Sequence, residues 1–222
     1  MSFYDHLIEA TAAERAQLLA APAINACLQG EVSLATYLAF LQQAFHHVRH
    51  TTPLLMAVGS RLPDRLAWLR RPVAEYIEEE IGHEEWILDD IAAAGGDAVA
   101  ARASQPQLPA DVMVAYAYDR VQRRNPVGFF GMVFVLEGTS VALALHAADL
   151  IQQALGLPDA AFSYLRSHGT LDQEHTQHLA DLVNRMTPED QAEVLHCARV
   201  FYQLYGDIFR NLPLPDQEMA WN

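Results

Sequence analysis

The sequence predicts an all-α protein, a single bundle of seven or eight helices, and three observations support this. Alanine, leucine, glutamate, glutamine and arginine, which favour helices, dominate the chain. Alternating runs of β-branched residues and Asn-Gly hairpin turns are absent from the sequence. Capping residues, prolines and glycines recur at a spacing that suits helices joined by short turns. We therefore expect one domain over residues 1–222, with a mobile tail at 213–222.

Helix boundaries in the first half follow from capping residues and helix breakers. Ser2 can cap a first helix, and Thr11 with Glu14 has the spacing of a capping box for its continuation toward Leu19. Pro53 should kink a longer helix, because proline removes one backbone hydrogen bond. The further segments expected are Pro22 to Gly30, Leu34 to Leu62, and helical stretches after Pro63 and after Pro72 that end at Gly95-Gly96.

The second half is expected to hold four helices, after a least regular stretch at 97–109. Proline or a capping residue marks the start of each one. Their expected ranges are about 109–124, 126–156, 158–186 and 187–211. Residues 127–145 are apolar enough to resemble a membrane span, but Glu137, Thr139 and Ser140 interrupt them. We interpret this segment as a core helix and expect no membrane span.

Charge and residue usage exclude several classes of protein. The chain has 28 acidic and 14 basic residues, and its net charge of -14 has the wrong sign for binding nucleic acid. Every basic residue is arginine, so no lysine can form a Schiff base or a Walker A phosphate site, which excludes pyridoxal enzymes, Schiff-base aldolases and P-loop NTPases. The two cysteines, Cys27 and Cys197, lack metal-site spacing and favour a reducing, cytoplasmic location.

Two segments carry a carboxylate three residues before a histidine, a spacing that puts both side chains on one helix face. The pairs are Glu80 with His83 and Asp172 with His175. His168 lies one turn before Asp172 and extends the second stripe. We expect these five side chains to face the interior of the bundle as candidate metal ligands.

Glu137 stands alone in the apolar central segment, where an isolated carboxylate costs several kcal/mol unless a cation or hydrogen-bond donors compensate it. An arginine or tyrosine of a neighbouring helix could do so. The two carboxylate–histidine pairs favour a metal instead, because bundle proteins with two irons use Glu plus Glu-x-x-His, each twice. Mixed imidazole and carboxylate ligands suit iron or manganese, with zinc as a competitor. We expect two ferrous ions.

One carboxylate of that pattern is missing. The helix after Ser33 offers only glutamine and histidine at the corresponding place, so either His46 or His47 replaces it or His168 completes the set. Glu79 is an alternative to Glu80 as a ligand, and His178 could donate a hydrogen bond behind the ligands.

Glycines adjoin candidate ligands in all three segments, at Gly82, Gly138 and Gly169. Each costs about 1 kcal/mol inside a helix relative to alanine. Local unwinding or close approach beside a metal or substrate would explain this cost, and close helix packing is the alternative.

These motifs resemble those of the heme-oxygenase-like diiron oxidases, a group that includes UndA-like and CADD-like enzymes and shares a superfamily with heme oxygenase, TenA and PqqC. The resemblance spans roughly residues 33–186. It is carried by the segment Glu79-Glu80-Ile81-Gly82-His83-Glu84-Glu85-Trp86, by the lone Glu137 and by the stripe His168-x3-Asp172-x2-His175. It implies a heme-oxygenase-like bundle with the site in its middle.

The resemblance also implies an O2-dependent non-heme iron oxidoreductase that oxidises a small organic substrate, such as an aliphatic carboxylate or an amino acid. A homodimer is typical of the superfamily. Arg49 or Arg166 could anchor a substrate carboxylate. Two alternatives are a non-catalytic iron-binding protein and a metal-free TenA/PqqC-like binding or accessory protein. The implied iron ligands are Glu80, His83, Glu137, His168, Asp172 and His175.

Overall fold

The structure is a computed structural model that describes residues 1–214, apart from the side chains of residues 170–174. The described residues form helices and no strand, which confirms the all-α prediction. The predicted ligand Asp172 and residues 215–222 of the expected mobile tail lie outside this description. Pro213, at the start of that tail, accepts a hydrogen bond from Thr36 through its backbone oxygen, at 2.9 Å.

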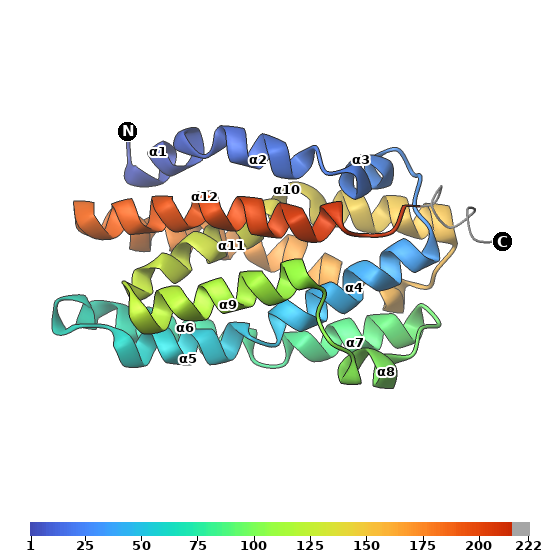
Figure 1. Ribbon diagram of the computed structural model, residues 1–222, viewed down its shortest axis with the longest axis horizontal. Helices are drawn as coiled ribbons and strands as arrows, with labels where there is room; N and C mark the ends of the chain where they lie inside the picture. Colours follow the sequence, from blue (N-terminus) through green and yellow to red (C-terminus); the bar gives the residue numbers. More distant parts are fainter. Residues whose placement is uncertain (215–222) are drawn as a thin grey trace.

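Twelve α-helices form most of the described part of the chain, and α12 runs along the molecule between α1–α3 on one side and α4 and α9 on the other (Figure 1). Three short 3-10 helices occupy 64–69, 126–128 and 159–161. The α-helices are, in order, α1 (Phe3–Ala10), α2 (Ala12–Leu19), α3 (Pro22–Leu28), α4 (Leu34–Val48), α5 (Thr51–Arg61), α6 (Arg70–Glu80), α7 (His83–Ala93), α8 (Ala98–Ala103), α9 (Leu108–Arg123), α10 (Phe129–Leu155), α11 (Ser163–Asn184) and α12 (Pro188–Arg210).

Breaks within expected segments explain why there are more helices than the seven or eight predicted. The expected helix over 34–62 is divided at Arg49 and His50 rather than kinked at Pro53. A proline ring clashes with the carbonyl four residues earlier, and for Pro53 that carbonyl belongs to Arg49. The capping box predicted at Thr11 is also wrong, because the Thr11 hydroxyl donates backward to the Leu7 carbonyl at 2.7 Å.

The stretch expected to be least regular contains a short helix, α8. The Asp97 side chain caps it by accepting a hydrogen bond from the Ala100 N–H at 2.9 Å. This Asp97 cap was not recognised in the sequence. Helix α8 packs against α7.

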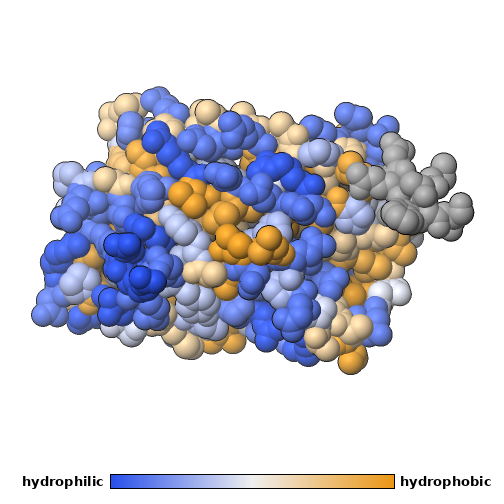
Figure 2. Space-filling view, viewed as in Figure 1, coloured by the Kyte–Doolittle hydropathy of each residue, from blue (hydrophilic) through white to orange (hydrophobic). Residues whose placement is uncertain are grey.

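Helix α10 is the centre of the bundle and packs chiefly against α11 and α12. Within the described residues, 126–155 is the one segment that could cross a membrane by length and composition, but most of it is buried inside the protein, as in a core helix. The outer face drawn in Figure 2 is mostly hydrophilic, with an apolar area near its middle.

Two separate clusters of apolar side chains form the core, and α10 contributes to both. Its first turns, from Phe129 to Val135, belong to one cluster, and Ala144, Ala148 and Ile151 belong to the other. Between them α10 carries buried Glu137 and Thr139. The fold therefore places a polar layer between two apolar ones.

Buried Asp190 joins the start of α12, where it also bonds the N-cap Thr187, to two other places in the chain. Its carboxylate accepts hydrogen bonds from Asn125 at 2.8 Å, from Thr187 at 2.8 Å and from both terminal nitrogens of Arg65. Burial acts to raise the pKa of Asp190, but these hydrogen bonds hold the pKa below its usual value.

We expect Asp190→Ala to lower the free energy of unfolding by about 2–3 kcal/mol, because it leaves Arg65, Asn125 and Thr187 without their acceptor. Urea denaturation measures this change. Since the folded pKa lies below the unfolded value of about 3.9, the stabilisation is complete above that value and is lost as the pH falls through the folded pKa. The difference between the variant and the parent should therefore shrink in acid.

Asp64→Ala is the matched control for this measurement. Asp64 is fully exposed and pairs with Arg70 at the surface, so its loss should change the free energy of unfolding by less than about 0.5 kcal/mol. Equal losses for the Asp64 and Asp190 variants would contradict the role given to Asp190.

Candidate metal centre

Glu80, His83 and His168 form a compact group of metal-ligating side chains. Glu80 is the last residue of α6, His83 is the first of α7 and His168 lies on α11. One ligand atom from each lies within 4.8 Å of the other two, and His83 Nδ1 is 3.1 Å from Glu80 Oε2. Glu80 and His83 are buried and His168 is half-buried. This group can hold one cation with two imidazoles and a carboxylate.

Glu80 and His83 do not share one helix face, contrary to the sequence-based expectation. The helix ends at Glu80, Ile81 is extended, and Gly82 has a φ of 91°, in the left-handed region that favours glycine. The two side chains meet across this turn instead. The local unwinding expected beside a ligand therefore occurs at Gly82.

The other two glycines beside candidate ligands have different surroundings. A Cβ on Gly169 would lie 2.7 Å from Leu145 Cγ, so this glycine allows α10 and α11 to pack closely. Gly138 lies in continuous helix, and a Cβ there would meet nothing within 4 Å. Close packing, the alternative explanation, is thus found at Gly169, and nothing in the structure explains Gly138.

A second group lies around His175 of α11. His175 Nε2 is 3.2 Å from Glu79 Oε2, and His175 Nδ1 is 3.6 Å from Glu137 Oε1. Glu137 and His175 are buried, whereas the Glu79 side chain is 54% exposed. Glu79 and Glu80 are therefore not alternatives at one position, because each lies in a different group.

Tyr76 of α6 connects the two groups, although it was not among the site residues predicted from the sequence. Burial, then the charges of Glu137, Glu80 and Glu79, and finally a hydrogen bond with Glu137 raise the pKa of Tyr76. The tyrosine partner considered as an alternative for Glu137 is therefore present. The spacing offered a signal, because Tyr76 lies three and four residues before the two glutamates.

Aromatic rings enclose the first group. Trp86 stacks on His83 with ring centroids 4.0 Å apart, and the Tyr164 ring lies 4.8 Å from that of His168. His83 and His168 themselves meet edge to face at 4.9 Å. Trp86 and Tyr164 are each one helical turn from the histidine they contact, and this regularity could have identified them in the sequence.

Asp90 of α7 fixes the start of α11. Its buried carboxylate accepts hydrogen bonds from the Ser163 and Tyr164 N–H groups, both at 2.9 Å, and from the Ser163 hydroxyl. Burial raises the pKa of Asp90 in spite of these bonds. Because α7 begins with His83 and α11 carries His168, this contact holds the two histidine-bearing helices together.

The histidines of α4 are both buried but face different neighbours. His46 Nε2 lies 2.8 Å from the Ser104 hydroxyl, beyond the end of α8 and away from the first group. The His47 ring lies 5.8 Å from that of Tyr205. Burial, followed by the electrostatic interaction with His168, lowers the pKa of His47 to about 3, so the His47 imidazole is neutral near pH 7. Neither residue belongs to the three-residue group.

His178 is half-buried, with its ring 5.6 Å from that of Tyr76. Its buried Nε2 has no hydrogen-bond partner among the described residues, so the hydrogen bond considered for His178 stays a prediction.

The two arginines considered as substrate anchors line neither of the two cavities described below, and their role as anchors stays a prediction. Arg49 is exposed and lies over the Phe45 ring at 5.2 Å. Arg166 donates to Gln152 at 2.7 Å and to Asp149 at 3.3 Å.

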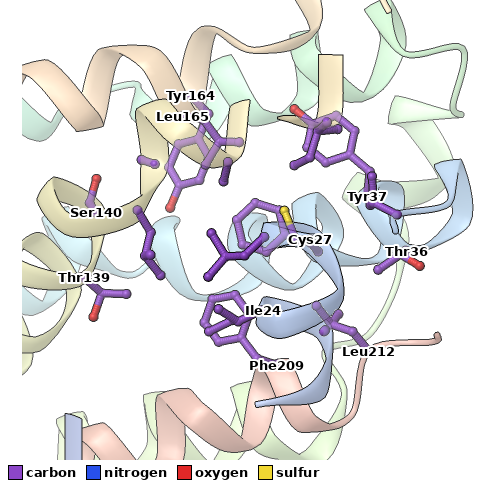
Figure 3. Close-up of a pocket in the computed structure, with 18 of the residues that line it drawn as sticks. Ile24, Cys27, Thr36, Tyr37, Thr139, Ser140, Tyr164, Leu165, Phe209 and Leu212 are labelled. Atoms are coloured by element: carbon purple, nitrogen blue, oxygen red, sulfur yellow. The ribbon is translucent and has the colours of Figure 1, made fainter. Parts of the chain in front are cut away.

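Two cavities adjoin the candidate ligands. The metal-side cavity has about 660 Å³ of empty space, its open side included, and is lined by Glu80, Glu137 and His168 among others. The apolar cavity has about 810 Å³ on the same basis and extends toward α3 and α4 (Figure 3). Both are lined by Ser140, Tyr164, His168 and Tyr205, so these side chains separate the two spaces.

Comparison with solved structures assigns this architecture to the heme-oxygenase-like fold. A domain of unknown function from Shewanella denitrificans with that fold has a TM-score of 0.86 at 21% identity, over 96% of this chain and 92% of that one. A TenA homolog from Pseudomonas syringae has a TM-score of 0.76 at 12% identity, over 94% and 90%. A CADD-like protein from Nostoc punctiforme has a TM-score of 0.72 at 15% identity, over 99% of each chain.

Residues 38–206 match the iron-containing redox enzyme family, and the chain belongs to this family. A search of curated proteins finds no match. The family predicted from the glutamate and histidine motifs is therefore confirmed, as is the heme-oxygenase-like fold.

We expect Gly82→Ala and Gly138→Ala to change stability in opposite directions. Alanine at Gly82 must adopt a positive φ, which should lower the free energy of unfolding by about 1–2 kcal/mol. Alanine at Gly138 has open space in a regular helix and should raise it by about 0.5–1 kcal/mol. Urea denaturation measures both. Unchanged or increased stability of the Gly82 variant would argue against the turn at Gly82, and a loss in the Gly138 variant would argue against the open space at that position.

Proposed function

We propose that this protein is a non-heme iron oxidase or oxygenase that holds two ferrous ions and uses dioxygen to oxidise a small organic substrate. The observation that supports it most is the compact group of Glu80, His83 and His168, contributed by three helices. Membership of the iron-containing redox enzyme family agrees with this proposal.

The residues present fit iron. Two imidazoles and a carboxylate suit a first ferrous ion at Glu80, His83 and His168. For the second ion we propose Glu137 and His175, with Glu79 beside them. Asp172 is proposed from its sequence position alone. The three carboxylates act together on the Tyr76 hydroxyl, and divalent cations between them would reduce their mutual repulsion.

Ferrous iron bound here would supply the electrons and open coordination positions that dioxygen activation needs. The side chains of the protein position the metal ligands and exclude water from the site. Trp86 fixes the ring plane of His83, and Asp90 fixes the start of α11. Because its pKa is raised, the Tyr76 hydroxyl stays protonated and can donate to the backbone oxygen of His175, 3.5 Å away. Apolar residues of α10 in the metal-side cavity, Met132 and Leu136 among them, exclude water.

A metal-free binding protein is the second candidate. The closeness of the Tyr76 hydroxyl to Glu137 favours it, because a polar neighbour partly compensates the buried carboxylate without a metal. The similarity to a TenA homolog is compatible with it. A homodimer, a cytoplasmic location and the absence of nucleic-acid partners stay predictions from the sequence.

We expect His83→Ala and His175→Ala each to remove one iron position, with about tenfold or greater loss of affinity for that ion, because each deletes an imidazole ligand. Asp172→Ala should act like His175→Ala. The measurement is the iron content after anaerobic loading with ferrous ion. Oxygen consumption by the iron-loaded variants should fall together with their iron content.

His196→Ala is the control for these variants, because His196 is exposed on α12, outside both groups. It should keep the iron content and oxygen consumption of the parent protein. Unchanged iron content in the His83 or His175 variant would refute the ligand assignment, and absence of bound iron in the parent protein would favour the metal-free candidate.

A further inference from the structure

We propose that the apolar cavity binds a slender hydrocarbon tail of the substrate, and that Ala144 and Ala147 of α10 set the length of tail that fits. This rests on the proposed function in one respect, since the other end of the substrate would lie at the metal centre. The length of the cavity, the side chains that line it and its position beside the metal-side cavity support this proposal.

One face of α10 forms a wall of the cavity from end to end. Ser140, Ala144, Ala147 and Ile151 all line it, and they stand at positions i, i+4, i+7 and i+11. At about 1.5 Å per residue, these eleven steps cover about 16 Å. The cavity is therefore long in the direction of this helix.

A face of α12 forms a second wall in the same direction. Tyr205 and Phe209 of α12 line the cavity one helical turn apart, and Leu212 lines it just beyond the end of this helix. Tyr205, like Ser140, also lines the metal-side cavity, whereas Leu212 and Ile151 line only the apolar one. Figure 3 places Ser140 at one side of the space and Leu212 at the other. The two helices thus define a metal end and a far end.

Polar groups that could orient a substrate gather at the metal end. Ser140, Tyr164, Tyr205 and His168 lie there, in the wall shared with the metal-side cavity. Beyond them the described lining contains no aspartate, glutamate or arginine, and the hydroxyls of Thr36 and Tyr37 on the α4 side already donate to backbone oxygens. A charged group in the far part would lose its hydration without a compensating partner. The cavity therefore favours a molecule with its polar end toward the metal ligands and its hydrocarbon part away from them.

Small side chains keep the middle of the cavity open. Ala144 is buried and Ala147 is half-buried, and both line the space between Ser140 and Ile151. A leucine at either position would extend into the cavity and shorten it. Ala144 lies about 4.5 Å nearer the metal end than Ala147, since three residues separate them. The two substitutions should thus shorten the accepted tail by different amounts.

Straight-chain primary alcohols from hexanol to dodecanol test the proposal, because they are neutral and differ only in tail length. Their binding to the iron-free full-length protein is measured by calorimetry. Affinity should rise about fourfold for each added methylene until the tail fills the cavity, and then stop rising. In Ala147→Leu the rise should stop at a shorter alcohol, and in Ala144→Leu at a shorter one still.

Ala142→Leu is the matched control, because Ala142 is exposed on α10 and does not line the cavity. It should keep the parent's length limit. Ala147→Val adds less volume than leucine, so it should shift the limit in the same direction by a smaller step, even if a leucine variant does not fold.

Two results would overturn the proposal: affinity that does not depend on tail length in the parent protein, or the same length limit in the parent and in all the cavity variants. Since these measurements use no iron, they are independent of the test of the metal centre. If the parent protein fails to bind iron in the loading experiment but still binds alcohols with a length limit, the proposed oxidase function is wrong and the proposed tail site stands.

Discussion

The structure depends on accommodating carboxylates and imidazoles in the middle of an apolar helical core. Helix α10 contributes to one apolar cluster before Glu137 and to another after it, so this carboxylate lies between two hydrophobic regions. Burying such a group is costly unless opposite charge or hydrogen-bond donors surround it. The neighbouring helices supply such groups here: α6 contributes Tyr76 and α11 contributes His175. The polar layer and the packing of these helices around α10 are therefore one arrangement.

The turn at Ile81 and Gly82 has a direct effect on this layer. In one continuous helix, Glu79 and Glu80 would differ by about 100° in direction, and His83 would follow along the same axis. The interruption separates α6 from α7, and His83 contacts Glu80 across it and stacks on Trp86. Glu79 remains on α6 and reaches His175 instead. One glycine with a positive φ thus allows two adjacent glutamates to serve two groups.

Much of this arrangement could be predicted from local sequence patterns. Helical composition gave the fold class, and the spacing of acids and histidines gave the family and brought Glu80, His83, Glu137, His168 and His175 to attention. Features that depend on contacts between distant segments could not be predicted in this way. The cap that Asp90 provides for α11 joins residues more than seventy positions apart. Similarly, nothing in the sequence showed that Arg166 pairs with Gln152 and Asp149 rather than facing a cavity.

The position of the apolar cavity gives the same polar layer a second consequence. The layer is the metal-end boundary of a space whose other walls are mostly apolar and contain no aspartate, glutamate or arginine in the described lining. Water in such a space makes few hydrogen bonds, so an apolar group can displace it at little cost. At the shared wall, by contrast, the tyrosine and serine hydroxyls and His168 can interact with a polar group. A ligand that enters is thus oriented by the difference between the two ends, without an arginine to fix its charge.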